Sequence, residues 1–387
     1  MADGLTDSGL EALRALAEGH VGDAGVPGVV ALVARHGQVH VEALGSLSYG
    51  GAPIARDSLF RIASITKPVT AAATMALADE GLLALDDPID ELVPELAARR
   101  VLVRMDGPLE DTVAAERAIT ARDLLTFTFG FGLSPAMFGG PDTWPVLAAE
   151  RELRLATFGM PDPDLQPDPD TWIANLGTLP LLAQPGERWL YNTGSSVLGV
   201  LCARAARRPF AEVLETRLFT PLGMSDTAFW TADTERLATA YRWSPDGLLV
   251  ADEPGGAWSR PPVFGDGAAG LLSTVDDLHT FARMLLDGGA GVLSAAAVAA
   301  MTTDQLTDEQ KSHGGLDPKF FVGRSWSFGQ AVHDSGAFGW DGGFGTTWLV
   351  DPPNDLVVIV FTQRIFETYR APQVHRDLQR AAYAALA

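Results

Sequence analysis

The chain has 387 residues, a length that predicts two or three domains and allows a large buried core. Apolar residues make up 47% and charged residues 20% of the chain, a composition that excludes a mainly disordered protein. The 28 basic and 49 acidic residues give a net charge of −21, and no basic stripe interrupts the acidic background. We therefore expect neither a nucleic acid nor a membrane as partner.

The beginning of the chain predicts an amphipathic helix over residues 8–18. This segment is acidic and lacks the basic start and apolar run of a secretory signal, so we expect a cytoplasmic location. No apolar stretch reaches the roughly 18 residues of a membrane span. The one cysteine, Cys202, excludes an internal disulfide, and its apolar neighbours predict a core residue.

The next segments predict a β-hairpin over residues 29–43, with its turn at His36 and Gly37. A short extended piece at 60–63 then leads into a helix from Ser64 to about Gly81. Between about 75 and 225 most periodic segments are helical, for example 120–127 and 196–206. A loop rich in proline and aspartate interrupts them at 161–170.

Strand patterns return after residue 225, at 326–332, 345–350 and 356–362. Helices are expected at 275–287, with Thr274 as N-cap, and at 371–387. Strands at both ends with helices between them predict an α+β fold whose antiparallel sheet is flanked by helices. We expect residues 1–75 and 226–387 to form this discontinuous sheet domain, and residues 76–225 to form a mostly helical domain.

The first chemical motif is Ser64-Ile65-Thr66-Lys67, at a step from strand to helix. Residues three apart share one face of a helix, so the lysine amine can reach the serine hydroxyl. A serine needs such a base to become a nucleophile, and the helix N-terminus favours developing negative charge. The Ser-x-x-Lys pattern alone is weak, because a chain of this length is expected to contain about one chance match.

Two further segments contain residues that are expected to act together with Ser64 and Lys67. Tyr191 precedes a predicted helix, and a nearby lysine cation is expected to lower the pKa of its phenol and make it a base. Residues 338–348 are rich in glycine, which predicts a close backbone approach to a ligand. An edge strand there would present N–H groups to an acyl oxygen. Separately, the tyrosine is explained as a core residue and the glycines as a bend in a sheet.

Together and in this order, the three segments resemble the class C β-lactamase and penicillin-binding-protein-like serine hydrolases, over about residues 25–363. The resemblance implies the β-lactamase-like fold. It also implies that Ser64 is the acylated nucleophile, Lys67 its activating lysine and Tyr191 the tyrosine of the Y-x-N motif. The oxyanion hole would be formed by the N–H groups of Ser64 and Gly343.

The sequence departs from this family pattern at two positions. Thr193 stands where the family has asparagine, and Asn192 comes one place early. Trp340 replaces the basic residue that begins the third motif, which makes the motif similar to the W-x-G of family VIII carboxylesterases. Both departures argue against a lactam substrate. The expected substrate-binding residues are Trp340, Asp341, Gly342, Thr193 and Phe344.

The function expected from the sequence is therefore cleavage of carboxylic esters through an acyl-enzyme on Ser64. In this hypothesis Tyr191, tuned by Lys67, takes the proton of the serine. Other activities stay open: a β-lactamase, a D-amino-acid peptidase or amidase, an acyltransferase, or a non-hydrolysing penicillin-binding or sensor protein. No metal or nucleotide motif is found, so no cofactor is expected beside a small ester substrate. The oligomeric state is not predicted.

Overall fold

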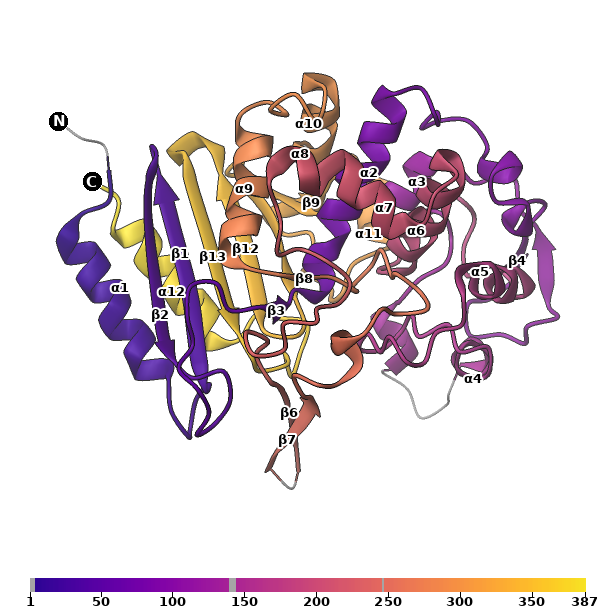
Figure 1. The fold of residues 1–387 in the computed structure, drawn as a ribbon. Coiled ribbons are helices and arrows are strands. Elements are labelled where there is room, and N and C mark those ends of the chain that lie inside the picture. The colour runs from indigo at the N-terminus through magenta and orange to yellow at the C-terminus, as the bar shows by residue number, and fades with distance from the viewer. Residues whose placement is uncertain (1–3, 139–143, 246) are drawn as a thin grey trace.

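The centre of the molecule is a seven-stranded antiparallel sheet (Figure 1). The computed structural model describes residues 4–138, 144–245 and 247–387. The sheet order is β2-β1-β13-β12-β11-β10-β9. Its strands are β1 (Gly28–Arg35), β2 (Gln38–Gly45), β9 (Arg324–Trp326), β10 (Ala331–His333), β11 (Phe338–Gly342), β12 (Thr346–Asp351) and β13 (Leu356–Thr362). This arrangement confirms a sheet built from the two ends of the chain.

One face of the sheet is covered by the terminal helices α1 (Asp7–His20) and α12 (Gln373–Ala384), which lie side by side (Figure 1). Their apolar stripes, including Leu13 and Leu378, pack on residues of β1 and β13 such as Val358. The predicted amphipathic helix at 8–18 is thus confirmed, with Thr6 as its cap. Within the described ranges, no helix is both long and apolar enough to cross a membrane.

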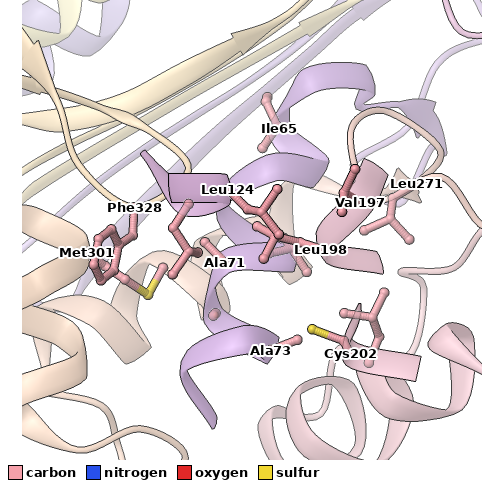
Figure 2. Close-up of a cluster of buried hydrophobic side chains, with 14 of the residues drawn as sticks. Ile65, Ala71, Ala73, Leu124, Val197, Leu198, Cys202, Leu271, Met301 and Phe328 are labelled. Atoms are coloured by element: carbon pink, nitrogen blue, oxygen red, sulfur yellow. The ribbon is translucent and has the colours of Figure 1, made fainter. Parts of the chain in front are cut away.

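The opposite face packs on α9 (Val275–Leu286), and behind it lie α10 (Ala295–Thr302) and α2 (Thr66–Asp79). The Thr274 side chain accepts a hydrogen bond from Asp277 N, as its predicted role as N-cap requires. Almost every side chain of α2 is buried, and Figure 2 shows this helix among residues from α3, α6 and the 301–328 region. A helix that is apolar all round belongs in a core. The lysine of the first motif is therefore carried into that core.

The middle of the chain forms the helices that lie beside the sheet in Figure 1. They are α3 (Ala121–Leu125), α4 (Pro145–Glu152), α5 (Pro169–Thr178), α6 (Thr193–Ala206), α7 (Phe210–Leu214) and α8 (Thr220–Leu222). Small strand pairs accompany them: β3 (Phe60–Arg61) with β8 (Leu272–Ser273), β4 (Arg100–Leu102) with β5 (Thr112–Ala114), and β6 (Ala240–Ser244) with β7 (Gly247–Asp252). The division into domains at residues 75 and 226 stays a prediction.

The expected strand at 326–332 is wrong, because the chain reverses there. Ser327 N donates to Gln330 O at 2.9 Å, and Gly329 adopts a φ of +79° in the turn. The segment therefore forms the hairpin of β9 and β10. A short helix, α11 (Asp308–Ser312), precedes this hairpin.

Candidate active site

The candidate nucleophile lies in a tight turn between β3 and α2. Ser64 is the middle residue of the 3-10 turn Ala63–Ile65, directly before α2 begins. Ala63 has a φ of +43°, a strained value for a residue with a side chain, and such strain is common at functional sites. Lys67 follows one turn later, and its Nζ donates to Ser64 Oγ at 2.9 Å. The two side chains meet as their spacing predicts.

Lys67 is completely buried, although a lysine is usually exposed. Its Nζ also donates to Ala268 O at 2.8 Å and lies 4.6 Å from the centre of the Tyr191 ring. Burial lowers the pKa of the Lys67 amine to about 7, and the negative charge of Asp266 offsets part of that effect. A neutral amine, able to accept the serine proton, is therefore well populated near neutral pH.

Tyr191 is held in place by its backbone. It exchanges two hydrogen bonds with Leu133, at 2.8 and 3.0 Å. The next residue, Asn192, has φ +85° and ψ −67°, and Thr193 N donates to Tyr191 O across it at 3.3 Å. These values describe a γ-turn with positive φ at its centre, a rare and strained conformation. The turn ends the extended segment and starts α6.

The hydroxyl of Tyr191 has a hydrogen-bond partner that was not predicted from the sequence. Trp340 Nε1 donates to Tyr191 Oη at 2.8 Å. The expectation that a lysine cation lowers the pKa of Tyr191 is wrong: burial raises the pKa, and the contacts with Ser64 and Trp340 only reduce that rise. A tyrosine in this environment keeps its proton at neutral pH, so it can donate a proton more readily than it can accept one.

The third motif lies on β11, which is an interior strand and not the edge strand we expected. However, β10 pairs with β11 at Phe338 and Gly339 alone, so the second half of β11 extends past β10 toward the site. At Gly342 a side chain would overlap the Ile62 carbonyl oxygen. This glycine lets the strand approach the turn that carries Ser64.

A cavity of about 530 Å³ opens at these residues. Besides Ser64, Tyr191, Trp340, Asp341 and Gly343, its wall is mostly apolar. The main apolar contributors are Leu133, Ala156, Phe158, Met160, Pro161, Leu316, Phe320 and Phe366. This size and lining are typical of pockets for small organic ligands.

Three of the expected substrate-binding residues do not line the cavity. Thr193 is completely buried at the start of α6 because the γ-turn directs it inward. Phe344 packs edge-on against Trp258 in the core, with ring centres 5.4 Å apart. Gly342 faces the Ile62 backbone, as described above.

Three aromatic residues near the site segments belong to the core and not to the cavity wall: Trp189, Phe328 and Trp348.

Asn192 lines the cavity in place of Thr193, but its amide is already engaged. Its Nδ2 donates to Thr157 O at 2.8 Å. The same loop is held at Leu155 O by Gln166 Nε2 and Trp172 Nε1. Asn192, which lies one position before the place of the asparagine in the Y-x-N motif, therefore anchors the loop that forms one wall of the cavity.

Three charged residues of the cavity were not predicted from the sequence: Asp266, Arg324 and Glu367, whose carboxylate pairs with Arg364 at 2.7 Å. Asp266 is buried in the segment before β8, where glycine and alanine neighbours gave only a faint signal of a special backbone. Arg324 begins β9 and has its guanidinium 4.1 Å from the Phe320 ring centre, and nothing in the sequence marked it. Arg324 also partly offsets the burial that raises the pKa of Asp341 to about 6. Arg324 therefore places a cation in the cavity, although Trp340 occupies the position of the basic residue that begins the third motif in the family.

Comparison with known proteins agrees with this geometry. The model of the Beta-lactamase family matches residues 13–382, so the chain belongs to that family, within a superfamily of serine hydrolases. Protein Rv1367c of Mycobacterium tuberculosis (strain ATCC 25618 / H37Rv) is 42% identical over 332 residues, which cover 81% of this chain and 79% of the relative. Esterase EstB of Burkholderia gladioli is 30% identical over 387 residues, covering 92% and 91%.

The fold is shared with solved structures as well. EstCE1, described as a hydrolase with promiscuous acyltransferase activity, superposes with a TM-score of 0.82 at 24% identity, covering 97% of this chain and 98% of that one. These comparisons confirm the β-lactamase-like fold and the family that the three motifs indicated.

Proposed function

We propose that this protein is a serine hydrolase that cleaves carboxylic esters through an acyl-enzyme on Ser64. The observation that carries the proposal is the 2.9 Å contact between Ser64 Oγ and the buried Lys67 amine, whose pKa is lowered to about 7. The mostly apolar cavity at this pair suits an ester with an apolar acyl group. The similarity of this chain to the esterase EstB supports the same substrate class.

The proton path follows from the two perturbed pKa values. As Ser64 Oγ attacks the ester carbon, its proton passes to the neutral Lys67 amine, and the N–H groups of Ser64 and Gly343 hold the oxyanion. Tyr191, which keeps its proton, gives that proton to the leaving alcohol oxygen and regains one from the Lys67 ammonium. Water then releases the acyl group as a carboxylic acid. In this scheme Lys67 is the base that takes the serine proton, the role that the sequence suggested for Tyr191, and Tyr191 is the acid that protonates the leaving group.

The preference for esters over lactams rests on two groups that are already engaged. The indole N–H of Trp340 is bonded to Tyr191, and the amide of Asn192 is bonded to Thr157 O. The indole has no second N–H to offer the carboxylate of a lactam, and Thr157 O takes one of the two amide N–H groups of Asn192. Loss of the charge-assisted contact to the carboxylate costs about 1.5–3 kcal/mol and loss of the neutral amide contact about 0.5–1.5 kcal/mol, which together lower kcat/KM by about two orders of magnitude.

The test is a panel of p-nitrophenyl esters of several chain lengths beside a chromogenic cephalosporin. We expect kcat/KM for the best ester to exceed that for the cephalosporin by at least about a hundredfold. The Ser64→Ala variant, which removes only a hydroxyl, is the matched control and should lose both activities. Equal efficiency toward the cephalosporin and the best ester would refute the assignment of substrate class.

A further inference from the structure

A buried carboxylate lies beside the catalytic pair, and the scheme above does not use it. Asp266 is 6% exposed and lines the same cavity as Ser64. Carboxylates are almost never buried this deeply unless they are paired or hydrogen-bonded. Its contacts therefore indicate why the chain retains a charge at this position.

The contacts of Asp266 join the two segments that carry the candidate catalytic side chains. Its Oδ1 accepts from Ser196 Oγ at 2.6 Å and from Ala268 N at 2.9 Å. Ser196 is in the first turn of α6, which begins just after Tyr191. Ala268 is the residue whose carbonyl oxygen accepts from Lys67 Nζ. One carboxylate thus links the start of α6 to the backbone that holds the lysine.

We propose that Asp266 is a positioning residue that fixes the main-chain acceptor of Lys67 and supplies the negative charge against which the lysine amine titrates. The proposal rests on the proposed function, in which Lys67 takes the proton of Ser64. Among the described residues, Asp266 is the negative charge that acts on the buried Lys67 ammonium, so removing the carboxylate would leave that ammonium without a counter-charge. Protonation of the amine would then be still less favourable.

The charges around Lys67 support the proposal that Asp266 supplies its counter-charge. Asp266, from the loop before β8, faces Lys67 and raises its pKa, which burial lowers. Tyr191, from the segment before α6, faces Lys67 with its ring, and Asp341 on β11 acts on Tyr191. Burial raises the pKa of Asp266 itself, while Ser196, Ala268 and the lysine stabilise its charged form. Asp266 and Lys67 therefore titrate as a coupled pair.

The decisive variant is Asp266→Asn, because an asparagine oxygen still accepts from Ser196 and Ala268 while the charge is gone. The protein has three lysines, Lys67, Lys311 and Lys319, so an NMR titration of isotope-labelled lysine side chains resolves each one. The ion pairs of Lys311 raise its pKa, so it does not titrate near neutrality. In the wild type we expect one lysine signal to titrate near pH 7.

In Asp266→Asn this midpoint should fall by about one pH unit, the lower end of what a close opposite charge contributes. The acid limb of the pH profile for labelling of Ser64 by a fluorophosphonate should move by the same amount. An unchanged midpoint in both measurements would overturn the proposal, even if the labelling rate falls. The NMR readout does not depend on activity, so a protein that is not acylated would refute the proposed function and leave this test intact.

Thr70→Val is the matched control. Thr70 Oγ1 donates to Gly267 O at 2.7 Å in the same loop, so this variant loosens the loop without removing a charge. We expect slower labelling with an unchanged midpoint; a midpoint shift as large as that of Asp266→Asn would also overturn the proposal. If Asp266→Asn does not fold, Ser196→Ala decides, because removing this donor weakens the charged form of Asp266. It should shift the midpoint in the same direction by a smaller amount, and no shift would count against the proposal.

Discussion

The hydrogen bond from Trp340 to Tyr191 is the feature that most clearly separates this site from one with a basic residue at position 340. Replacing Trp340 by phenylalanine removes the indole N–H and keeps an aromatic ring. The ring contacts with Trp326, at 4.7 Å between centres, and with Phe320, at 6.2 Å, are apolar and survive in part. We therefore expect the Trp340→Phe variant to fold.

The expected loss is in kcat. A polar group that loses its partner in a protected site costs about 1–3 kcal/mol. If that cost falls on the transition state, kcat decreases by about 5- to 150-fold. We expect a decrease of about tenfold with little change in KM, because the Tyr191 hydroxyl remains but is no longer held in line with the leaving group. The assay is steady-state hydrolysis of an alkyl ester such as ethyl acetate, followed by the release of acid, because an alkoxide needs a proton from Tyr191 to leave whereas p-nitrophenolate does not.

A double-mutant cycle separates this explanation from a general disturbance. Tyr191→Phe alone should lose about 10²–10⁴-fold in kcat, the usual contribution of a proton-transferring group. In the Tyr191→Phe variant the indole N–H of Trp340 has no acceptor, so adding Trp340→Phe should lower kcat no further. Trp348→Phe is the control, because the Trp348 indole nitrogen is buried without a partner among the described residues. Wild-type kcat in Trp340→Phe, or losses that multiply in the double variant, would refute the reasoning.

Three further predictions follow from the same geometry. The kcat/KM for p-nitrophenyl acetate should rise as the pH increases through about 7, because the Lys67 amine is protonated and unable to accept a proton below that value; a flat profile from about pH 5 to 9 would contradict this role. Gly342→Ala should lower the free energy of unfolding in urea by about 3 kcal/mol because its methyl group overlaps the Ile62 carbonyl oxygen, whereas Gly343→Ala, with 3.4 Å to the nearest atom, should be close to wild type. Arg324→Gln should lower kcat/KM about tenfold for an ester whose acyl chain ends in a carboxylate and leave the acetate ester within about twofold, and equal losses would show that the guanidinium is only structural.

Local patterns in the sequence predicted much of the fold because the physics behind them is local. The apolar spacing around Leu13 is enough to specify an amphipathic helix, and Thr274 caps α9 through a contact three residues away. The approach of Lys67 to Ser64 is likewise set by one helical turn. The hairpin of β9 and β10 was missed because Trp326 and Phe328 alternate with Ser327 and Gly329, as apolar and polar residues do in a strand, so only Gly329 marked the reversal.

The rest of the site depends on contacts between residues far apart in the chain. The Trp340 indole and the Tyr191 hydroxyl are 149 positions apart, and no spacing rule connects them. The γ-turn at Asn192 decides which side chain faces the cavity, and a motif with an asparagine one place early does not reveal that turn. The raised pKa of Tyr191 was missed for a related reason: burial depends on the whole fold, whereas the sequence showed only a lysine as a neighbouring charge.

Mass spectrometry of the protein quenched during turnover of a p-nitrophenyl ester tests directly whether Ser64 is acylated. We expect the acyl mass on the peptide that contains Ser64, in a proportion that rises with substrate concentration. We expect no such mass on Ser64→Ala. Turnover by the wild type with acylation of a different residue, or the same acyl mass on Ser64→Ala, would show that Ser64 is not the nucleophile.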